Sequence, residues 1–173
     1  MDAIHLRRAT AADLPALKAL MTRAIDALQA AFLTPEQVVA SHSVMGLDTQ
    51  LIADGTYWIA EIGGVLAGGG GWSRRATLYG GDTSAVARIP RLLDAAHEAA
   101  RIRAMYTDPG FTRRGVGRAI LDRCEAEARA EGFAEAMLMA TLAGEPLYRA
   151  AGYRVVERVI DRVPLVAMAK LLS

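Results

Sequence analysis

The sequence predicts a single α+β domain with a mixed central sheet of about six to seven strands and four main helices. Its length of 173 residues suits one domain with a real core, and its apolar content of 53% argues against disorder. Segments with strand and helix periodicity follow each other in the order β-α-α-β-β-β-α-β-α-β-β. No repeat, linker or low-complexity stretch interrupts them, so residues 1–173 are expected to form one domain.

The N-terminal part predicts one strand followed by two helices. Residues 4–8 alternate apolar and polar side chains, as a short strand does. Thr10 and Asp13 have capping-box spacing before a run whose apolar residues recur every three or four positions, which predicts an amphipathic helix. Thr34–Gln37 is a second start signal, with a hydroxyl at the N-cap and proline at the first helical position, and Gly46 ends that helix.

A short helical turn over residues 48–54 leads into a β-hairpin. Residues 57–62 have strand composition, Gly63-Gly64 suits a tight turn, and residues 65–72 form the return strand. Four consecutive glycines weaken that return strand, so we expect a β-bulge, a helix packed closely on the strand, or a ligand that approaches its backbone. The connection over residues 73–98 has little periodicity, and connections this long are usually mobile or functional.

Residues 100–130 predict a strand, a glycine-bearing turn and a helix. The extended run Ala100–Tyr106 breaks at Pro109-Gly110. The first N–H groups of the following helix have no internal partner, and the helix dipole adds positive potential there. Gly115 and Gly117 let a ligand touch the backbone, and three side chains add charge at the rim: Arg113, Arg114 and Arg118. The turn therefore predicts a phosphate or pyrophosphate site.

The C-terminal part predicts a strand, a short helix and a closing hairpin. Phe133–Thr141 is rich in Ala and Met and is expected to form a strand. Pro146–Ala151 is expected to form a short helix that ends at Gly152. Residues 153–159 and 163–171 complete the sheet as two antiparallel strands.

Two common phosphate motifs do not fit the turn at residues 109–118. A P-loop requires Lys and Ser/Thr where Val116 and Gly117 stand, and the dinucleotide fingerprint requires a third glycine where Ile120 stands. The turn instead resembles the acyl-CoA loop of the GNAT superfamily of N-acyltransferases, which reads Gln/Arg-x-x-Gly-x-Gly/Ala after a strand. Thr112 departs from that pattern. The matching residues are Pro109, Phe111, Arg114, Gly115, Val116 and Gly117.

The resemblance implies a GNAT-type fold whose strands splay apart at the CoA site. It implies acetyl-CoA as the cosubstrate, and no metal. The pantetheine arm is implied to pair with backbone groups of Met105, Tyr106 and Thr107, between strands 100–106 and 134–140. The pyrophosphate is implied to lie on the N–H groups of the loop, contributed by Arg113, Arg114, Gly115, Val116, Gly117 and Arg118.

Transfer of an acetyl group from a thioester to an amine requires no protein nucleophile, because the thioester is already activated. The amine must be neutral to attack, and a lysine-like amine with a pKa of about 10.4 is neutral in only about one molecule in a thousand at pH 7. The departing thiolate benefits from a nearby hydroxyl group. Tyr148, within a segment similar to the family's aromatic-Tyr-x-x-x-Gly-aromatic pattern, is the implied donor.

The general base is the least determined part of the site. Relatives often carry a glutamate near the start of the central strand, where this sequence has Arg101 and Arg103. Glu61 and His97 are the leading candidates among the acidic residues and histidines of the region, and a water chain to solvent could replace either. Cys124 lies on an apolar helix face and is expected to be a buried core thiol rather than a nucleophile.

The sequence thus predicts an acetyl-CoA-dependent N-acetyltransferase that acts by direct attack in a ternary complex. The acceptor is a small-molecule amine or a protein amino group. The alternative is a catalytically inactive acyl-CoA-binding module. The net charge of +1 favours neither nucleic acid nor a membrane surface as a partner, and a sequence with one cysteine and no signal-peptide pattern is expected to be cytoplasmic. A homodimer, common among relatives, is one option.

Overall fold

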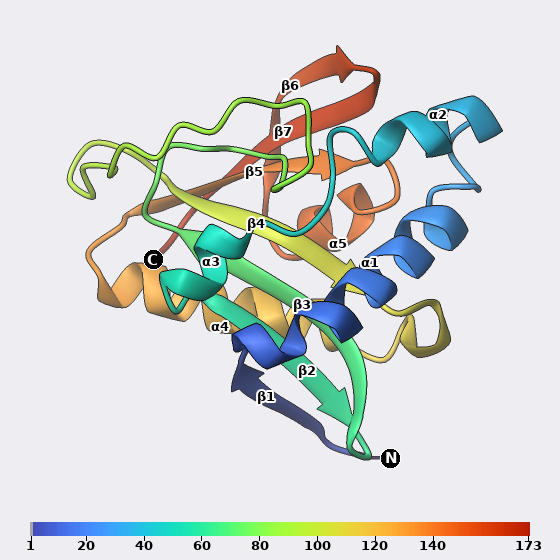
Figure 1. The fold of residues 1–173 in the computed structure, drawn as a ribbon. Helices are drawn as coiled ribbons and strands as arrows, with labels where there is room; N and C mark the ends of the chain where they lie inside the picture. Colours follow the sequence, from blue (N-terminus) through green and yellow to red (C-terminus); the bar gives the residue numbers. More distant parts are fainter. Residues whose placement is uncertain (1) are drawn as a thin grey trace.

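The structure, a computed structural model, describes residues 2–173 and is built around one mixed sheet (Figure 1). Its seven strands are neighbours in the order β1-β2-β3-β4-β5-β7-β6, and only the β4–β5 pair is parallel. The predicted α+β fold with a mixed sheet is confirmed. The strands are β1 (Ile4–Arg8), β2 (Tyr57–Ile62), β3 (Val65–Ser73), β4 (Ala100–Thr107), β5 (Glu135–Thr141), β6 (Arg154–Asp161) and β7 (Val163–Leu171).

Four predicted helices are present, together with the short helical turn expected over residues 48–54. The helices are α1 (Leu14–Leu28), α2 (Pro35–Ser41), α3 (Thr49–Ala53), α4 (Val116–Ala130) and α5 (Glu145–Ala150), with 3₁₀ turns η1 (Ala11–Asp13) and η2 (Pro109–Phe111). Within residues 2–173, every helix is too short or too polar to cross a bilayer. The predicted strand start at Phe133 is wrong by two residues, because the Phe133 N–H closes the end of α4 by donating to the Ala128 carbonyl.

The two faces of the sheet carry separate hydrophobic clusters. On one face, α1 packs Leu17, Leu20 and Met21 against strand residues such as Ile59. On the other, α4 packs Ile120, Leu121 and Cys124 under the sheet. Figure 1 shows α1 and α4 on opposite sides of the central strands. Cys124 is fully buried, as the sequence predicted, and burial raises the pKa of its thiol.

The glycine run of β3 is explained by close packing. A Cβ atom on Gly68 would lie 2.6 Å from Val116 Cγ1 and 2.9 Å from the Tyr106 carbonyl oxygen, and one on Gly71 would lie 2.7 Å from the Thr56 carbonyl oxygen. The run therefore lets α4 and neighbouring backbone approach β3 more closely than side chains would allow. The helix-packing interpretation is confirmed, and the ligand-approach alternative is not needed.

Strand β4 is paired very differently along its two edges. Towards β3 it is paired from Arg101 to Thr107, interrupted by a bulge at which Ala104 has a φ of 51°. The Tyr57 hydroxyl donates to the Ala104 carbonyl at 2.8 Å and holds the bulge in place. Towards β5 the register contains only Ala100↔Ala136 and Arg101↔Met137. Beyond Arg101 the two strands separate, which confirms the predicted splay.

The long connection between β3 and β4 is tied to the sheet through the buried side chain of Arg103, which also forms an ion pair with Asp48 before α3. Arg103 of β4 donates to Asp48 at 3.1 Å and to the carbonyl oxygen of Gly80 at 2.8 Å, and both side chains of the pair are almost fully buried. Burial lowers the pKa of Arg103, while the nearby Asp48 carboxylate opposes that shift. Breaking such a pair by removing one partner is strongly destabilising, so Arg103 is held firmly in place. Its hydrogen bond to the Gly80 carbonyl oxygen anchors the middle of the connection.

Candidate functional site

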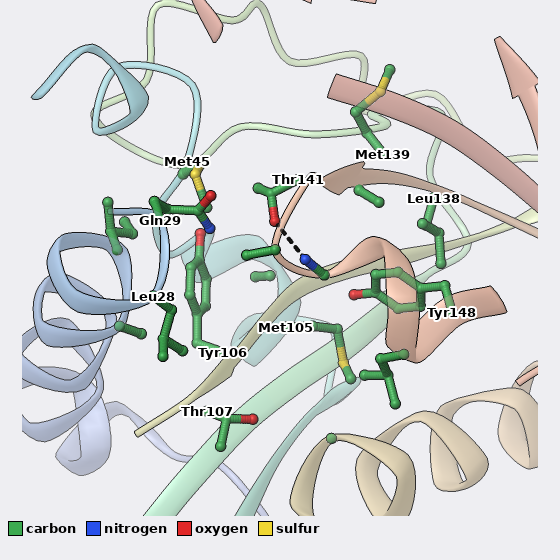
Figure 2. Close-up of a pocket in the computed structure, with 18 of the residues that line it drawn as sticks. Leu28, Gln29, Met45, Met105, Tyr106, Thr107, Leu138, Met139, Thr141 and Tyr148 are labelled. Carbon is green, nitrogen blue, oxygen red and sulfur yellow. Dashed lines mark hydrogen bonds between the residues drawn. The ribbon is translucent and has the colours of Figure 1, made fainter. Parts of the chain in front are cut away.

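A cavity of about 1000 Å³ lies where β4 and β5 separate. Its lining draws on both clusters of the core: Leu138 and Tyr148 belong to the α4 face, whereas Tyr106 and Ile25 belong to the α1 face. The cavity therefore passes through the sheet at the splay. Figure 2 shows Tyr106 and Tyr148 on opposite sides of this space.

One end of the cavity is formed by the loop before α4. Gly115 is the N-cap of α4 with a φ of 82°, and no side chain caps the helix. The first N–H groups of α4 are thus left for a ligand, and the helix dipole makes this end positive. Arg113 and Arg118 line the same end. A Cβ atom on Gly117 would meet Leu147 Cδ2 at 2.9 Å, so glycine lets α5 pack closely on the start of α4.

Two predicted loop residues do not line the cavity with their side chains. The Arg114 guanidinium lies over the Phe111 ring, 5.3 Å from its centroid. The Val116 side chain is buried against Gly68 of β3. Any contribution of these two residues to ligand binding would come from their backbone groups.

The three predicted residues of β4 all line the cavity. Met105, Tyr106 and Thr107 lie beyond the last residue of β4 that is in register with β5. An extended ligand can therefore lie along this edge as an added strand would. The Tyr106 hydroxyl accepts a hydrogen bond from the Gly46 N–H at 2.8 Å, and burial raises the pKa of this tyrosine to about 12.

Tyr148 lies on α5 at the α4 face of the cavity (Figure 2). Its ring packs edge-on against Tyr153 with centroids 5.8 Å apart, which fixes its orientation. Burial raises the pKa of Tyr148 well above its ordinary value. The phenol therefore stays protonated at neutral pH and cannot act as a base.

The structure does not bring Glu61 or His97 to the cavity. Glu61 lies on β2 and accepts a hydrogen bond from Arg7 Nε at 3.0 Å. His97 lies in the connection before β4, where its side chain is 80% exposed. Its hydrogen bond to Asp94 raises the pKa of His97. Among the described residues that line the cavity, none is Asp, Glu, His or Lys.

Part of the cavity wall was not predicted. The C-terminal end of α1 contributes Leu28 and Gln29, and Met45 comes from the segment after α2. The sequence signal for Gln29 was slight: a polar residue directly follows an apolar helix face. Tyr79 and Gly80 place part of the long connection at the same wall. Residues 2–173 contain no group of three or more His, Cys, Asp and Glu side chains suited to a metal ion.

The fold is similar to that of several solved N-acetyltransferases. The PaiA N-acetyltransferase of Thermoplasma acidophilum, in complex with coenzyme A, superposes with a TM-score of 0.68 at 14% identity over 98% of this chain and 99% of that one. A GCN5-related N-acetyltransferase from Rhodopseudomonas palustris gives a TM-score of 0.71 at 20% identity over 99% and 98%. YncA from Salmonella typhimurium, with its cofactor acetyl-CoA, superposes with a TM-score of 0.64 at 18% identity, over 99% of this chain and 95% of that one.

The sequence was also compared with curated proteins and with family profiles. Among the curated proteins no significant match was found. The profile of the acetyltransferase (GNAT) family matches residues 18–153, which include most of α1, the loop before α4 and Tyr148. This match covers most of the chain and agrees with the fold and with the splayed strands. The chain belongs to the acetyltransferase (GNAT) family.

Proposed function

We propose that this protein is an acetyl-CoA-dependent N-acetyltransferase in which the acceptor amine attacks the thioester directly within a ternary complex. The observation that carries the proposal is the cavity at the β4–β5 splay, which runs from the start of α4 past Tyr148 to the opposite face of the sheet. Such a passage lets a cosubstrate and an acceptor enter from different sides and meet in the middle. The family match and the CoA-bound structures of similar fold support it.

The residues around the cavity fit acetyl-CoA. The uncapped start of α4 offers N–H donors to a diphosphate, and Arg113 and Arg118 add positive charge there. Gly115 and Gly117 line this end and carry no side chain, so a ligand can approach their backbone closely. The edge of β4 from Met105 to Thr107 offers backbone groups to the pantetheine arm, and Arg114 and Val116 contribute through their N–H groups.

When bound, acetyl-CoA supplies an acyl group that is already activated. The protein therefore has only to position the two substrates and to protonate the leaving sulfur. The apolar walls strip water from the acceptor and favour its neutral form. Backbone N–H groups of β4 beyond Arg101 can donate to the carbonyl oxygen as negative charge develops on it. Tyr148 would donate its phenolic proton to the departing sulfur and regain a proton from the water that takes up the proton of the amine. The proton lost by the amine leaves through water, because Glu61 and His97 lie elsewhere.

No observation favours the inactive binding module. Tyr148 lies at the cavity, where its hydroxyl group can reach the sulfur of a bound thioester in the proposed reaction. The acceptor is proposed to be an amine, either on a small molecule or on a protein. The cytoplasmic location and the homodimer stay predictions.

Steady-state kinetics test the proposal. Release of free thiol from acetyl-CoA would be followed over a panel of amines, with each substrate varied at fixed levels of the other. Intersecting double-reciprocal lines are expected for a ternary complex, whereas parallel lines would indicate an acetylated enzyme. Calorimetry that detects CoA binding without turnover on any amine would contradict the proposal and favour the binding module.

A further inference from the structure

The cavity has an acceptor half, defined here as the part lined by the end of α1, by residues 44–46 and 78–80, and by Met139 and Leu165. Its walls are mostly apolar. The apolar side chains include Ile25, Leu28, Phe32, Val44, Met45, Leu78, Met139 and Leu165. None of the described lining residues carries a negative charge. The acceptor half therefore offers an entering ammonium group no counter-charge.

The cation nearest to this half is already neutralised. Arg103 lines the cavity, but its guanidinium is paired with Asp48 at 3.1 Å and bonded to the Gly80 carbonyl oxygen at 2.8 Å. Both side chains of the pair are buried. Asp48 is paired with both Arg103 and Arg88 and does not line the cavity, so it offers a charged acceptor no free carboxylate. A cationic amine would lose its hydration in this half without any compensating partner.

One polar side chain in the acceptor half lacks a partner. Gln29 is only 6% exposed and lines the cavity, and its Oε1 atom has no hydrogen-bond partner among the described residues. Buried amide oxygens are almost always hydrogen-bonded, because an unpaired one costs free energy. As placed, this oxygen is enclosed, and the amide nitrogen is the atom that is open to the cavity. A half-turn about the last side-chain torsion exchanges the two atoms, which turns the oxygen to the cavity and puts the nitrogen in the enclosed position.

The fold itself does not use this amide. The backbone of Gln29 ends α1, with its N–H donating to Ile25 and its carbonyl oxygen accepting from the N–H groups of Phe32 and Leu33. A leucine of similar size could make the same turn and pack better against the apolar wall. The amide is therefore an unused polar group at the surface of the cavity, and a ligand that brings a donor would satisfy it.

Gln29 meets the far end of an acceptor, not its reacting nitrogen. Figure 2 shows Gln29 and Tyr148 on opposite sides of the cavity. Since Tyr148 marks the end where the thiol departs in the proposed reaction, an acceptor that reaches both must span the space between them. Its body contacts the apolar walls, and its remote group contacts Gln29.

We propose that the acceptor half takes a small, largely apolar amine that is uncharged at neutral pH and carries a hydrogen-bond donor at its remote end, which Gln29 Oε1 accepts. This inference rests on the proposed function and narrows its substrate. Aliphatic amines with a pKa of about 10.4 are disfavoured, because only about one molecule in a thousand is neutral at pH 7. Arylamines, whose lone pair is conjugated with the ring, enter without losing a proton.

Three related probes separate charge from hydrogen bonding. Calorimetry on the CoA-saturated protein would measure the dissociation constants of meta-aminobenzamide, meta-aminoacetophenone and meta-(aminomethyl)benzamide. The second probe replaces the amide nitrogen of the first with a methyl group, and the third carries an ammonium group at pH 7. Meta-aminobenzamide is expected to bind roughly tenfold more tightly than either of the others. Raising the pH should reduce the difference in affinity between meta-aminobenzamide and the charged probe. It should not change the difference in affinity between meta-aminobenzamide and the acetophenone.

Variants at Gln29 test whether this side chain causes the differences in affinity among the three probes. Gln29→Leu should bring the benzamide and the acetophenone to equal affinity and raise the midpoint of thermal unfolding. Gln29→Glu should improve binding of the charged probe at pH 7. Gln37→Glu is the matched control, because it adds the same charge at the start of α2, outside the cavity, and a glutamate preserves the capping box with Thr34. It should leave all three constants unchanged.

Two outcomes would overturn the inference. One is equal affinity of the wild-type protein for the benzamide and the acetophenone. The other is a preference for the charged probe at pH 7 that Gln29→Leu leaves intact. Both can occur while CoA binds and an amine is turned over, in which case the proposed function stands. Loss of CoA binding and of thiol release with every amine would instead remove the proposed function.

Discussion

Strand β4 is paired along most of one edge, with β3, and along very little of the other, with β5. Against β3 it is paired along most of its length, and the glycines of β3 let α4 and backbone approach so closely that no side chain fits between them. Against β5 the register ends at Arg101, and a cavity of about 1000 Å³ opens beyond it. The same strand is therefore a tightly packed support on one edge and a free binding edge on the other.

This contrast explains how one strand can be both rigid and accessible. The backbone groups that β4 does not share with β5 are available to a ligand, while pairing with β3 and the hydrogen bond from Tyr57 hold them in position. A site built on such an edge is more exact in its geometry than one built on a loop. The two edges can be tested separately, since different residues support each.

The largest expected effect comes from adding a side chain on the packed edge. Gly68→Ala places a methyl group 2.6 Å from Val116 Cγ1 and 2.9 Å from the Tyr106 carbonyl oxygen. Overpacking of this kind should lower the free energy of unfolding by about 1 to 3 kcal/mol, measured by urea denaturation. Gly110→Ala is the control, because its methyl group would meet only an Asp108 carboxylate oxygen, at 3.3 Å. Equal stability of the two variants would contradict close packing of β3.

The next effect tests the cavity that opens beside the unpaired edge of β4, to which α5 contributes Tyr148. Tyr148→Phe should lower kcat about 10- to 100-fold with less than about a twofold change in the dissociation constant of CoA, because only the proton donor is removed. Since burial raises the pKa of Tyr148, wild-type kcat should show no decline between pH 7 and 9 from loss of this proton.

Tyr153→Phe provides the comparison for that experiment. The Tyr153 hydroxyl donates to Glu125 at 3.0 Å, and Tyr153 does not line the cavity. This variant should reduce stability but leave kcat within about twofold of the wild type. A matching loss of kcat in both tyrosine variants would show that Tyr148 acts through packing rather than by proton donation.

The smallest expected effect concerns charge at the start of α4. Arg118→Ala should weaken CoA binding about three- to tenfold, and less so at high salt, because exposed charges are screened. Arg114→Ala should change it less than about twofold, since that guanidinium lies over Phe111 and the backbone N–H remains. Calorimetry at two salt concentrations distinguishes the two. Equal losses would mean that net charge matters rather than position.

The sequence predicted the residues that line the cavity at the start of α4 far better than those that line its opposite end. The residues from Pro109 to Gly117 are contiguous, and the fold requires the same glycine and helix-start signals that the ligand uses. The splay followed from the family resemblance. The acceptor half is assembled from α1, the segment after α2 and the connection before β4, which lie far apart in the chain. No local pattern brings Gln29, Met45 and Tyr79 together.

The base candidates illustrate the same limit. Glu61 and His97 were chosen by residue type, and residue type does not indicate which way a side chain points. Glu61 is directed to Arg7, and His97 to Asp94 in an exposed turn. The sequence contains 19 acidic residues and three histidines. This composition could not predict that the described residues lining the cavity include none of them.

The passage of the cavity through the sheet also bears on how such proteins diverge. The features that would hold the nucleotide belong to the central strand and α4, where substitutions disturb the packed core. The opposite wall comes from a helix end and two connecting segments, where insertions and replacements are tolerated more easily. Proteins that descend from one ancestor can therefore change their acceptor substrate repeatedly while they keep the same acyl donor.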